Sequence, residues 1–403
     1  MSPLHNTLPV IVAGGGIGGL AAALALVRQG FAVTVLEQAP EIGEIGAGIQ
    51  IGPNGFHAFD ALGIGDKARG RAVYTDFMVM HDALDEYQVG KIPTDEKFRE
   101  RFGNPYAVIH RADVHLSLLE AAQETGQVQF HTSTRVVRIE QDDSSVTVWD
   151  QNGKAFKGCA LIGADGVKSV VREQFVGDPA RVTGHVVYRA VVDKKDFPAD
   201  LQWNAAAIWV GPNCHLVHYP LRGGEQYNVV VTFHSREQEE WGVKDGSKEE
   251  VQSYFQGICP KARQLIDLPK TWKRWATADR EPIGQWTYGR VSLLGDAAHP
   301  TTQYMAQGAC MAMEDAVTLG EALRVHHNDW PKALDMYQRA RVARTARIVL
   351  SSREMGRIYH AKGVERLVRN DLWRGRSPER FYDAMAWLYG WNVGNCLDAA
   401  QHH

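Results

Sequence analysis

The fold of this chain is decided by the stretch Pro9-Val-Ile-Val-Ala-Gly-Gly-Gly-Ile-Gly-Gly-Leu20. Its first half is a short β-rich run that ends in glycines, and the residues from Ile17 to Gln29 are rich in Ala and Leu, which indicates a helix that stops at Gly30. A second β-rich run, Phe31 to Leu36, ends at Glu37. The sequence therefore predicts a β-α-β unit with a glycine-rich first turn.

The glycines and the acid have the spacing of a dinucleotide-binding turn. Gly14, Gly16 and Gly19 satisfy G-x-G-x-x-G. The first glycine forms the turn, the second lets a pyrophosphate approach a helix N-terminus, and the third packs the helix on the strand. Glu37 is placed to accept hydrogen bonds from a ribose. The pattern predicts nucleotide binding, although NAD and FAD share this device.

A second glycine-rich stretch follows Glu37 directly. It runs from Glu41 to Asn54, where an NAD domain would usually continue its α/β alternation. We expect an extended loop here, which can lie along a longer ligand.

Composition sets limits on the class of protein. Of the 403 residues, 44% are hydrophobic and 23% are charged, which excludes a disordered or fibrous chain. The length predicts two or three structural units. With 44 basic and 47 acidic residues the net charge is −3, so no global attraction to nucleic acid or to anionic lipid follows.

Cysteines and apolar runs indicate the compartment. The five cysteines are odd in number and form no CxxC pair, which argues against a disulfide framework or a zinc site, so we expect no metal. The first apolar stretch, Leu8 to Ala13, has neither the basic start nor the length of a signal peptide. Later apolar runs are too short to span a bilayer. We expect a soluble, cytoplasmic protein.

Along the middle of the chain, the expected secondary structure changes from a mixture of helix and strands to strands that follow one another. We expect a helix over 111–122 and strands over 128–131, 135–141, 145–150 and 159–162. Strands are then expected over 184–192, 204–210, 215–220 and 227–233, with no helical pattern between the last three, followed by a helix over 249–265. This second set predicts an antiparallel sheet in a second domain or insertion.

Two further motifs follow strands. The first is Gly163-Ala-Asp165-Gly166, in which the acid either nears a ligand or caps the next helix. The second is Gly295-Asp-Ala-Ala-His-Pro300, followed by Gln307-Gly308 and by Glu314-Asp315-Ala316 within an expected helix over 309–323. Together with the glycine-rich turn, these motifs resemble, in order and spacing, those of the single-component FAD-dependent aromatic hydroxylases. The resemblance runs from residue 9 to about 350.

The resemblance implies which residues hold FAD. The glycine-rich turn and Glu37 would bind its ADP half, Arg111 its phosphates and ribityl chain, and Asp296 the ribityl chain, while the helix start at Gly308 would face the flavin ring. The full expected set is Gly14, Gly16, Ile17, Gly18, Gly19, Glu37, Gln38, Arg111, Val136, Asp165, Asp296, Gly308 and Ala309. One departure is the stretch Met305-Ala-Gln-Gly-Ala-Cys310, where many relatives have Gly-Gln-Gly-x-Asn.

The resemblance also implies an architecture. We expect a mixed α/β fold with a Rossmann-like FAD-binding domain, an inserted antiparallel-sheet substrate domain and a helical C-terminus. The expected ranges are 1–75, 100–181 and 283–335 for the FAD-binding domain, 76–99 and 182–282 for the substrate domain, and 336–403 for the C-terminal segment.

Candidate catalytic residues come from the β-rich segment and from the loop after Pro300. His215 and Tyr219 lie four apart, and on a strand such residues face the same side while His218 faces the other. A histidine with an ordinary pKa near 6.5 suits removal of a phenol proton. The plain alternative for His215 is a hydrogen-bonded histidine of the sheet. Together with Gln303, His215 and Tyr219 resemble the substrate-contacting set of the 3-hydroxybenzoate 6-hydroxylase branch.

The resemblance predicts para-hydroxylation of 3-hydroxybenzoate to 2,5-dihydroxybenzoate (gentisate), with NADH and O2 as co-substrates and through a flavin hydroperoxide. One alternative is a decarboxylating hydroxylase of salicylate or a hydroxynicotinate. Another, from a different class, is a lipid-binding escort protein on the same fold, against which the retained Asp165-Gly166 and Gly295-Asp296 speak.

The C-terminal part resembles a long amphipathic helix from Tyr337 to Tyr359. It carries the arginines Arg339, Arg341, Arg344, Arg347, Arg353 and Arg357, which we expect on a solvated face that makes ion pairs rather than on a lipid-binding or nucleic-acid-binding face. The aromatic residues between Trp373 and Trp391 are expected to cover the core or to form a contact in a homodimer.

Overall fold

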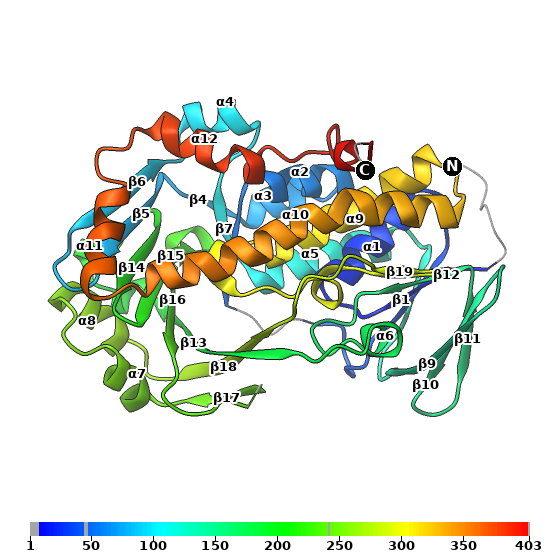
Figure 1. Cartoon of the computed structure of the whole chain (residues 1–403), viewed down its shortest axis with the longest axis horizontal. Coiled ribbons are helices and arrows are strands. Elements are labelled where there is room, and N and C mark those ends of the chain that lie inside the picture. Colours follow the sequence, from blue (N-terminus) through cyan, green and yellow to red (C-terminus); the bar gives the residue numbers. More distant parts are fainter. Residues whose placement is uncertain (1–7, 44–46, 241, 402–403) are drawn as a thin grey trace.

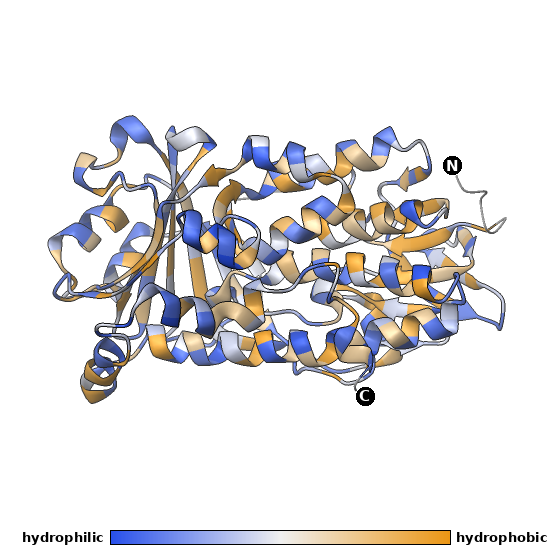
Figure 2. Ribbon diagram, turned by 90° about the horizontal axis from the view of Figure 1, so that it is seen from above, coloured by the Kyte–Doolittle hydropathy of each residue, from blue (hydrophilic) through white to orange (hydrophobic). Residues whose placement is uncertain are grey.

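The computed structural model describes residues 8–43, 47–240 and 242–401 of the chain. It has the predicted mixed α/β fold, in which two large sheets lie at opposite ends and long helices run between them (Figure 1). Strands are predominantly hydrophobic, whereas the long helices carry hydrophilic and hydrophobic residues (Figure 2). No helix within these residues is long and apolar enough to cross a membrane.

The predicted β-α-β unit is confirmed at the centre of a six-stranded sheet. In spatial order the strands are β19 (Thr287–Tyr288), β20 (Val291–Leu293), β12 (Ala160–Gly163), β1 (Val10–Ala13), β2 (Val33–Leu36) and β8 (Val128–His131). All neighbours pair in parallel except β19 with β20. The carboxyl ends of β1, β12 and β20 therefore meet at one edge, where such folds bind nucleotides.

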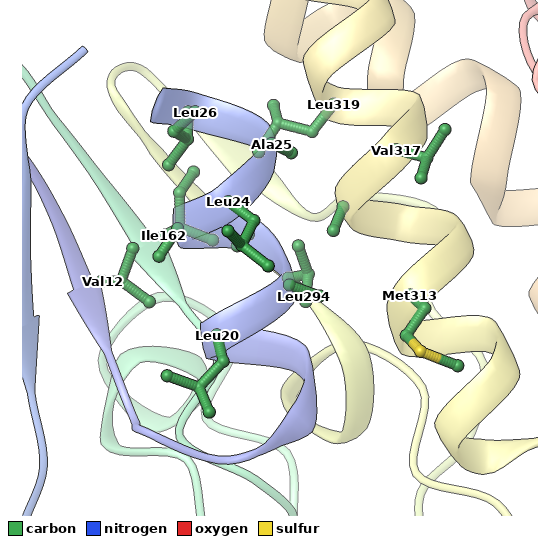
Figure 3. Packing of buried hydrophobic residues seen from close by; sticks show 14 of the residues in the cluster. Val12, Leu20, Leu24, Ala25, Leu26, Ile162, Leu294, Met313, Val317 and Leu319 are labelled. Carbon is green, nitrogen blue, oxygen red and sulfur yellow. The ribbon is translucent and has the colours of Figure 1, made fainter. Parts of the chain in front are cut away.

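Helix α1 (Ile17–Arg28) fixes that edge because it is buried between the sheet and helix α9 (Gly308–Val325). Figure 3 shows Leu24 of α1 between Ile162, which belongs to β12 of the sheet, and Leu294, which directly follows β20. Each leucine buried in this way contributes roughly 1.5–3 kcal/mol. The glycine-rich turn at the start of α1 is thus held on a rigid support.

The second large sheet contains the predicted β-rich segments. Its spatial order is β17 (Gly242–Gly246), β18 (Trp272–Asp279), β13 (Arg181–Asp193), β16 (Gln226–His234), β15 (Cys214–Leu221), β14 (Ala205–Gly211), β5 (Phe77–Asp82) and β6 (Gln88–Pro93). The pairing is antiparallel as predicted, apart from β14 with β5. Strands β5 and β6 at this edge are contributed by an earlier part of the chain.

The expected extended loop over Glu41–Asn54 is corrected by the structure from Gly48 onward. Strand β3 (Gly48–Ile51) pairs with β7 (Ala107–His110), which also pairs with β4 (Val73–Tyr74). Helix α2 (Pro53–Leu62) then begins with a proline, whose fixed φ suits a first helical turn. Residues 44–46 of this stretch lie outside the described residues. A third small sheet comprises β11 (Ala155–Gly158), β10 (Val146–Asp150) and β9 (Val136–Gln141).

The single helix expected over 249–265 is also wrong. Two helices, α7 (Lys248–Tyr254) and α8 (Pro260–Asp267), occupy this region. Pro260 has no backbone N–H and can only start a helix, and Gly257 takes a positive φ of 71° in the connection. The remaining helices of the first half are α3 (Gly65–Arg71), α4 (Glu96–Phe102), α5 (Arg111–Glu124) and α6 (Val170–Phe175).

The C-terminal part is helical, as predicted, and comprises α10 (Trp330–Tyr359), α11 (Gly363–Leu372) and α12 (Pro378–Tyr389). The expectation of a solvated arginine face on α10 is wrong for its centre. Arg341 is fully buried and pairs with Glu314 at 2.8 Å and Asp315 at 2.6 Å, because both acids lie on the adjacent helix α9. Arg344 pairs with Glu314 as well, at 2.7 Å.

Candidate active site

A single cavity of about 1160 Å³ connects the two large sheets. At one end it is lined by Gly16, Ile17 and Gly18 of the glycine-rich turn, and at the other by His215 and Tyr219 of the second sheet. A cavity with this lining offers space for an extended nucleotide and a small aromatic molecule together.

The glycine-rich turn fits a pyrophosphate. A Cβ at Gly14 would lie 2.3 Å from the carbonyl oxygen of Ala164, and one at Gly19 would lie 1.9 Å from that of Gly14, so both glycines are needed to build the turn. A Cβ at Gly16 would meet nothing within 4 Å. Gly16 instead borders open cavity at the N-terminus of α1, where no side chain caps the helix, so the helix N–H groups are available to an anion.

Glu37 is oriented by the same turn. Its carboxylate accepts hydrogen bonds from the backbone N–H groups of Gly15 and Ala39, both at 2.7 Å. Each carboxylate oxygen retains further acceptor capacity, which suits the ribose role expected for it. Glu37 itself is not among the residues that line the cavity, and neither are two other predicted cofactor residues: Gln38 is exposed, and Val136 packs in the core at 5% exposure.

Asp165 turns out to act as a helix cap. Its carboxylate accepts hydrogen bonds from the N–H groups of Val170 and Val171 and from the hydroxyl of Ser169, all at the start of α6. Burial raises the pKa of this carboxyl, against the effect of those hydrogen bonds. The cavity wall is formed instead by the next residue, Gly166, whose φ is 75°. Any contact of this motif with a cofactor would therefore come from Ala164 or Gly166 rather than from the carboxylate that was expected to make it.

The remaining predicted cofactor residues also line the cavity. Arg111 enters at the start of α5, Asp296 follows β20, and Gly308 with Ala309 begins α9. The structure thus brings Arg111 and the segment from Asp296 to Ala309 around the same space as the glycine-rich turn.

A buried polar network holds the loop between Asp296 and Gly308. Asp315 accepts hydrogen bonds from the backbone N–H of Gly295 at 3.0 Å and from Nε2 of His299 at 2.5 Å. Burial alone would raise the pKa of Asp315, but His299 and Arg341 outweigh it and lower that pKa. The loop that carries Asp296 is therefore fixed by a charged anchor beneath it.

The substrate end of the cavity is built on β15 and confirms the predicted alternation. His215, Val217 and Tyr219 line the cavity. His218 faces away and packs against Phe197 and Trp203, with ring centroids at 5.7 and 5.5 Å.

Gln303 lies in the segment before α9 and contacts the second sheet. It also lines the cavity, and its Nε2 donates to Oγ1 of Thr232 on β16 at 3.3 Å. The three predicted catalytic residues, His215, Tyr219 and Gln303, are thus brought to one wall region of the same cavity.

Burial sets the protonation states at this end. His215 is 3% exposed, and burial, with a smaller contribution from the neighbouring His185, lowers its pKa to about 3. It is therefore a neutral imidazole at neutral pH, able to accept a proton. Its Nδ1 is hydrogen-bonded to Nε2 of His360 at 2.8 Å. Burial raises the pKa of Tyr219, so its hydroxyl stays protonated and can donate.

Sequence reasoning missed two residues of this region. Arg189 of β13 lines the cavity, and the fields of Tyr219 and Arg111 act on its guanidinium, whose pKa is lowered by burial. Its signal was a cation near the centre of a largely apolar run of β13. His360 follows α10 and is 145 residues away from its partner His215, so no local pattern could have joined the two.

Fold and cavity together define the class of the protein. The glycine-rich dinucleotide turn borders the same cavity as the buried, neutral His215 and the tyrosine side chain of Tyr219. A family model described as FAD binding domain matches residues 7–352, and the chain belongs to this family. It is an FAD-dependent monooxygenase.

Comparisons with known proteins show which FAD-dependent enzymes this chain is similar to. The chain is 86% identical over 397 residues to a 3-hydroxybenzoate 6-hydroxylase of Polaromonas naphthalenivorans, an alignment that covers 98% of this chain and 99% of the relative. It is 60% identical to a 3-hydroxybenzoate 6-hydroxylase of Klebsiella oxytoca, with 98% and 100% covered. Among solved structures, Klebsiella pneumoniae HpxO complexed with FAD and uric acid is 29% identical, with a TM-score of 0.82 over 95% of this chain and 97% of that one.

Proposed function

We propose that this protein hydroxylates 3-hydroxybenzoate at C6, para to the hydroxyl group, and forms 2,5-dihydroxybenzoate with NADH and O2 as co-substrates. Two near-full-length relatives carry the corresponding name, 3-hydroxybenzoate 6-hydroxylase. The single observation in the molecule that carries the proposal is the placement of neutral His215 and of Gln303 on the wall of one cavity.

The chain's own residues divide the work along the cavity. The turn at Gly16, the arginine Arg111 and the loop at Asp296 would hold FAD. When bound, FAD takes reducing equivalents from NADH and activates O2 for transfer to an aromatic ring. Apolar residues of the wall, such as Val217 and Met305, would limit the access of water to that step.

The substrate-side residues prepare and orient the ring. His215 accepts the phenol proton, and the resulting phenolate enriches the ring carbons ortho and para to it. Gln303 hydrogen-bonds the same oxygen, so the hydroxyl is held at His215 and the para carbon points away from it, toward the flavin side. Arg189, with Tyr219 beside it, supplies a cation and a hydroxyl donor for the ring carboxylate.

The proposal is tested by following NADH oxidation over a panel of hydroxybenzoates and identifying each product. We expect 3-hydroxybenzoate to be consumed one-to-one with NADH and O2, to yield 2,5-dihydroxybenzoate and to release no CO2. The alternative, a decarboxylating hydroxylase, requires ipso attack on salicylate. Catechol and CO2 formed from salicylate, with 3-hydroxybenzoate untouched, would refute the proposal.

A further inference from the structure

A cluster of four histidines adjoins the substrate end of the cavity. His215 of β15, His185 of β13, His234 of β16 and His360 after α10 come together where the C-terminal end of α10 reaches the second sheet (Figure 1). The ring centroids of His215 and His360 are 5.1 Å apart, those of His360 and His185 are 5.5 Å apart, and those of His185 and His234 are 5.1 Å apart. The proposed chemistry uses only the first of these residues.

The cluster leads from the cavity to the surface. His215 is buried and lines the cavity. His360 and His185 are partly exposed, and neither belongs to the cavity wall among the residues that the structure describes. His234 is exposed. The side chains of His185, His215 and His234 lie on the same face of the second sheet as the cavity-lining Arg189, and the partly exposed His360 packs against this cluster beside the cavity.

We propose that His360 carries the substrate's phenol proton from His215 to solvent, an inference that rests on the proposed function. The phenol O–H bond breaks and the proton forms an N–H bond at Nε2 of His215. The N–H bond at Nδ1 of His215 breaks at the same time, and its proton binds Nε2 of His360 across the 2.8 Å hydrogen bond. The Nδ1 proton of His360 then passes to water. One proton leaves in total, and the phenolate remains.

The groups around His360 favour onward transfer of a proton over its retention on the imidazole ring. Burial, reinforced by the neighbouring histidines, lowers the pKa of His360 well below its ordinary value, and burial lowers that of His185 to about 4. The other titratable groups that face the cluster are the hydroxyls of Tyr304 and Tyr359 and the carboxylate of Asp279. A proton that reaches His360 is consequently not retained, and it moves on to solvent.

The relay is tested on oxidised, FAD-loaded protein without NADH, so that hydroxylation is not needed. Binding of 3-hydroxybenzoate is mixed with a pH indicator in a stopped-flow instrument, and the rate constant of proton release is measured. His360→Gln keeps a hydrogen-bond acceptor for His215 but cannot pass a proton on. We expect its rate constant of release to fall at least about tenfold, with substrate affinity within about twofold of wild type.

Two further variants separate relay from positioning. His360→Ala should be slow in the same way, and added imidazole should restore its rate of proton release, which a purely structural role would not allow. His131→Gln, on β8 at the far edge of the FAD-binding sheet, is the matched control and should behave as wild type.

The possible outcomes distinguish the two proposals. Wild-type release rates in His360→Gln, or slow release in His360→Ala that imidazole does not restore, would overturn the relay. Normal proton release by the wild type, together with failure to hydroxylate 3-hydroxybenzoate when NADH and O2 are added, would overturn the proposed function instead.

Discussion

At the scale of single residues, the face of β15 on which a side chain lies decides whether a histidine is chemical or structural. His215 and His218 lie three residues apart on one strand and are both buried. Burial lowers the pKa of each to about 3. They differ because His215 opens onto the cavity, whereas His218 packs between aromatic rings on the other side.

This difference predicts opposite outcomes for the same substitution. His215→Asn should slow hydroxylation by about 10²- to 10⁴-fold, the usual contribution of a general base, while NADH still reduces FAD. Oxygen consumption should then yield hydrogen peroxide in place of product. His218→Asn is the matched variant and should lower the melting temperature without this uncoupling. The measurement is the ratio of product to NADH consumed, and a fully coupled His215→Asn enzyme would contradict the role.

The lowered pKa of His215 also sets the pH below which this base becomes protonated. A histidine whose pKa is lowered to about 3 stays unprotonated as the pH falls from 8 to 5. Loss of activity through protonation of His215 in the free enzyme is therefore expected only below pH 5, not near the ordinary value of 6.5.

At the scale of elements, helices α9 and α10 are joined by charge rather than by apolar contact alone. Glu314 and Asp315 of α9 and Arg341 of α10 are all fully buried. Asp315 also holds the loop that lines the cavity, through Gly295 and His299. The arginine thus connects the stability of the helix pair to the geometry of the site.

Removal of that arginine should be costly. Arg341→Met leaves Asp315 without its arginine and Glu314 with Arg344 alone, and breaking a buried pair in this way typically costs about 3–5 kcal/mol. Arg324→Met removes an exposed pair with Glu321 in the same region and should change stability by no more than about 0.5 kcal/mol. The comparison is made by urea unfolding of FAD-saturated protein. Equal effects of the two substitutions would show that the buried network carries no special stability.

At the scale of the whole molecule, the cavity joins two sheets that come from interleaved parts of the chain. The FAD-binding end belongs to the six-stranded sheet, and the substrate end to the eight-stranded sheet. A cofactor bound in this space contacts the folded protein only, because the residues around it are far apart in the unfolded chain.

We therefore expect FAD to stabilise the whole fold. At a free concentration 100 times its Kd, a ligand that binds only the folded state adds about 2.7 kcal/mol, so added FAD should raise the melting temperature of the apoprotein. Gly16→Val should reduce the rise with FAD, because its side chain would occupy the open space beside the glycine-rich turn. Gly284→Ala, at an exposed position, should keep the full rise. An undiminished rise in Gly16→Val would place FAD elsewhere.

The sequence by itself determined the elements whose signal is local. The turn from Gly14 to Gly19 and the alternation of His215, His218 and Tyr219 are set by periodicity and by the freedom of glycine, which neighbouring residues carry. Both were predicted correctly for that reason. The choice of FAD, in contrast, came from the order of three motifs and not from the turn.

The partners of distant side chains depend on how the helices and sheets pack together. Arg341 was expected in solvent and is buried, because the acids of α9 lie against it, and the side chain of Asp165 caps α6 rather than lining the cavity. His360 is placed beside His215 by the length and direction of α10. Burial, ion pairing and shifted pKa values depend on what packs against a residue in three dimensions, and sequence periodicity carries no information about that neighbour.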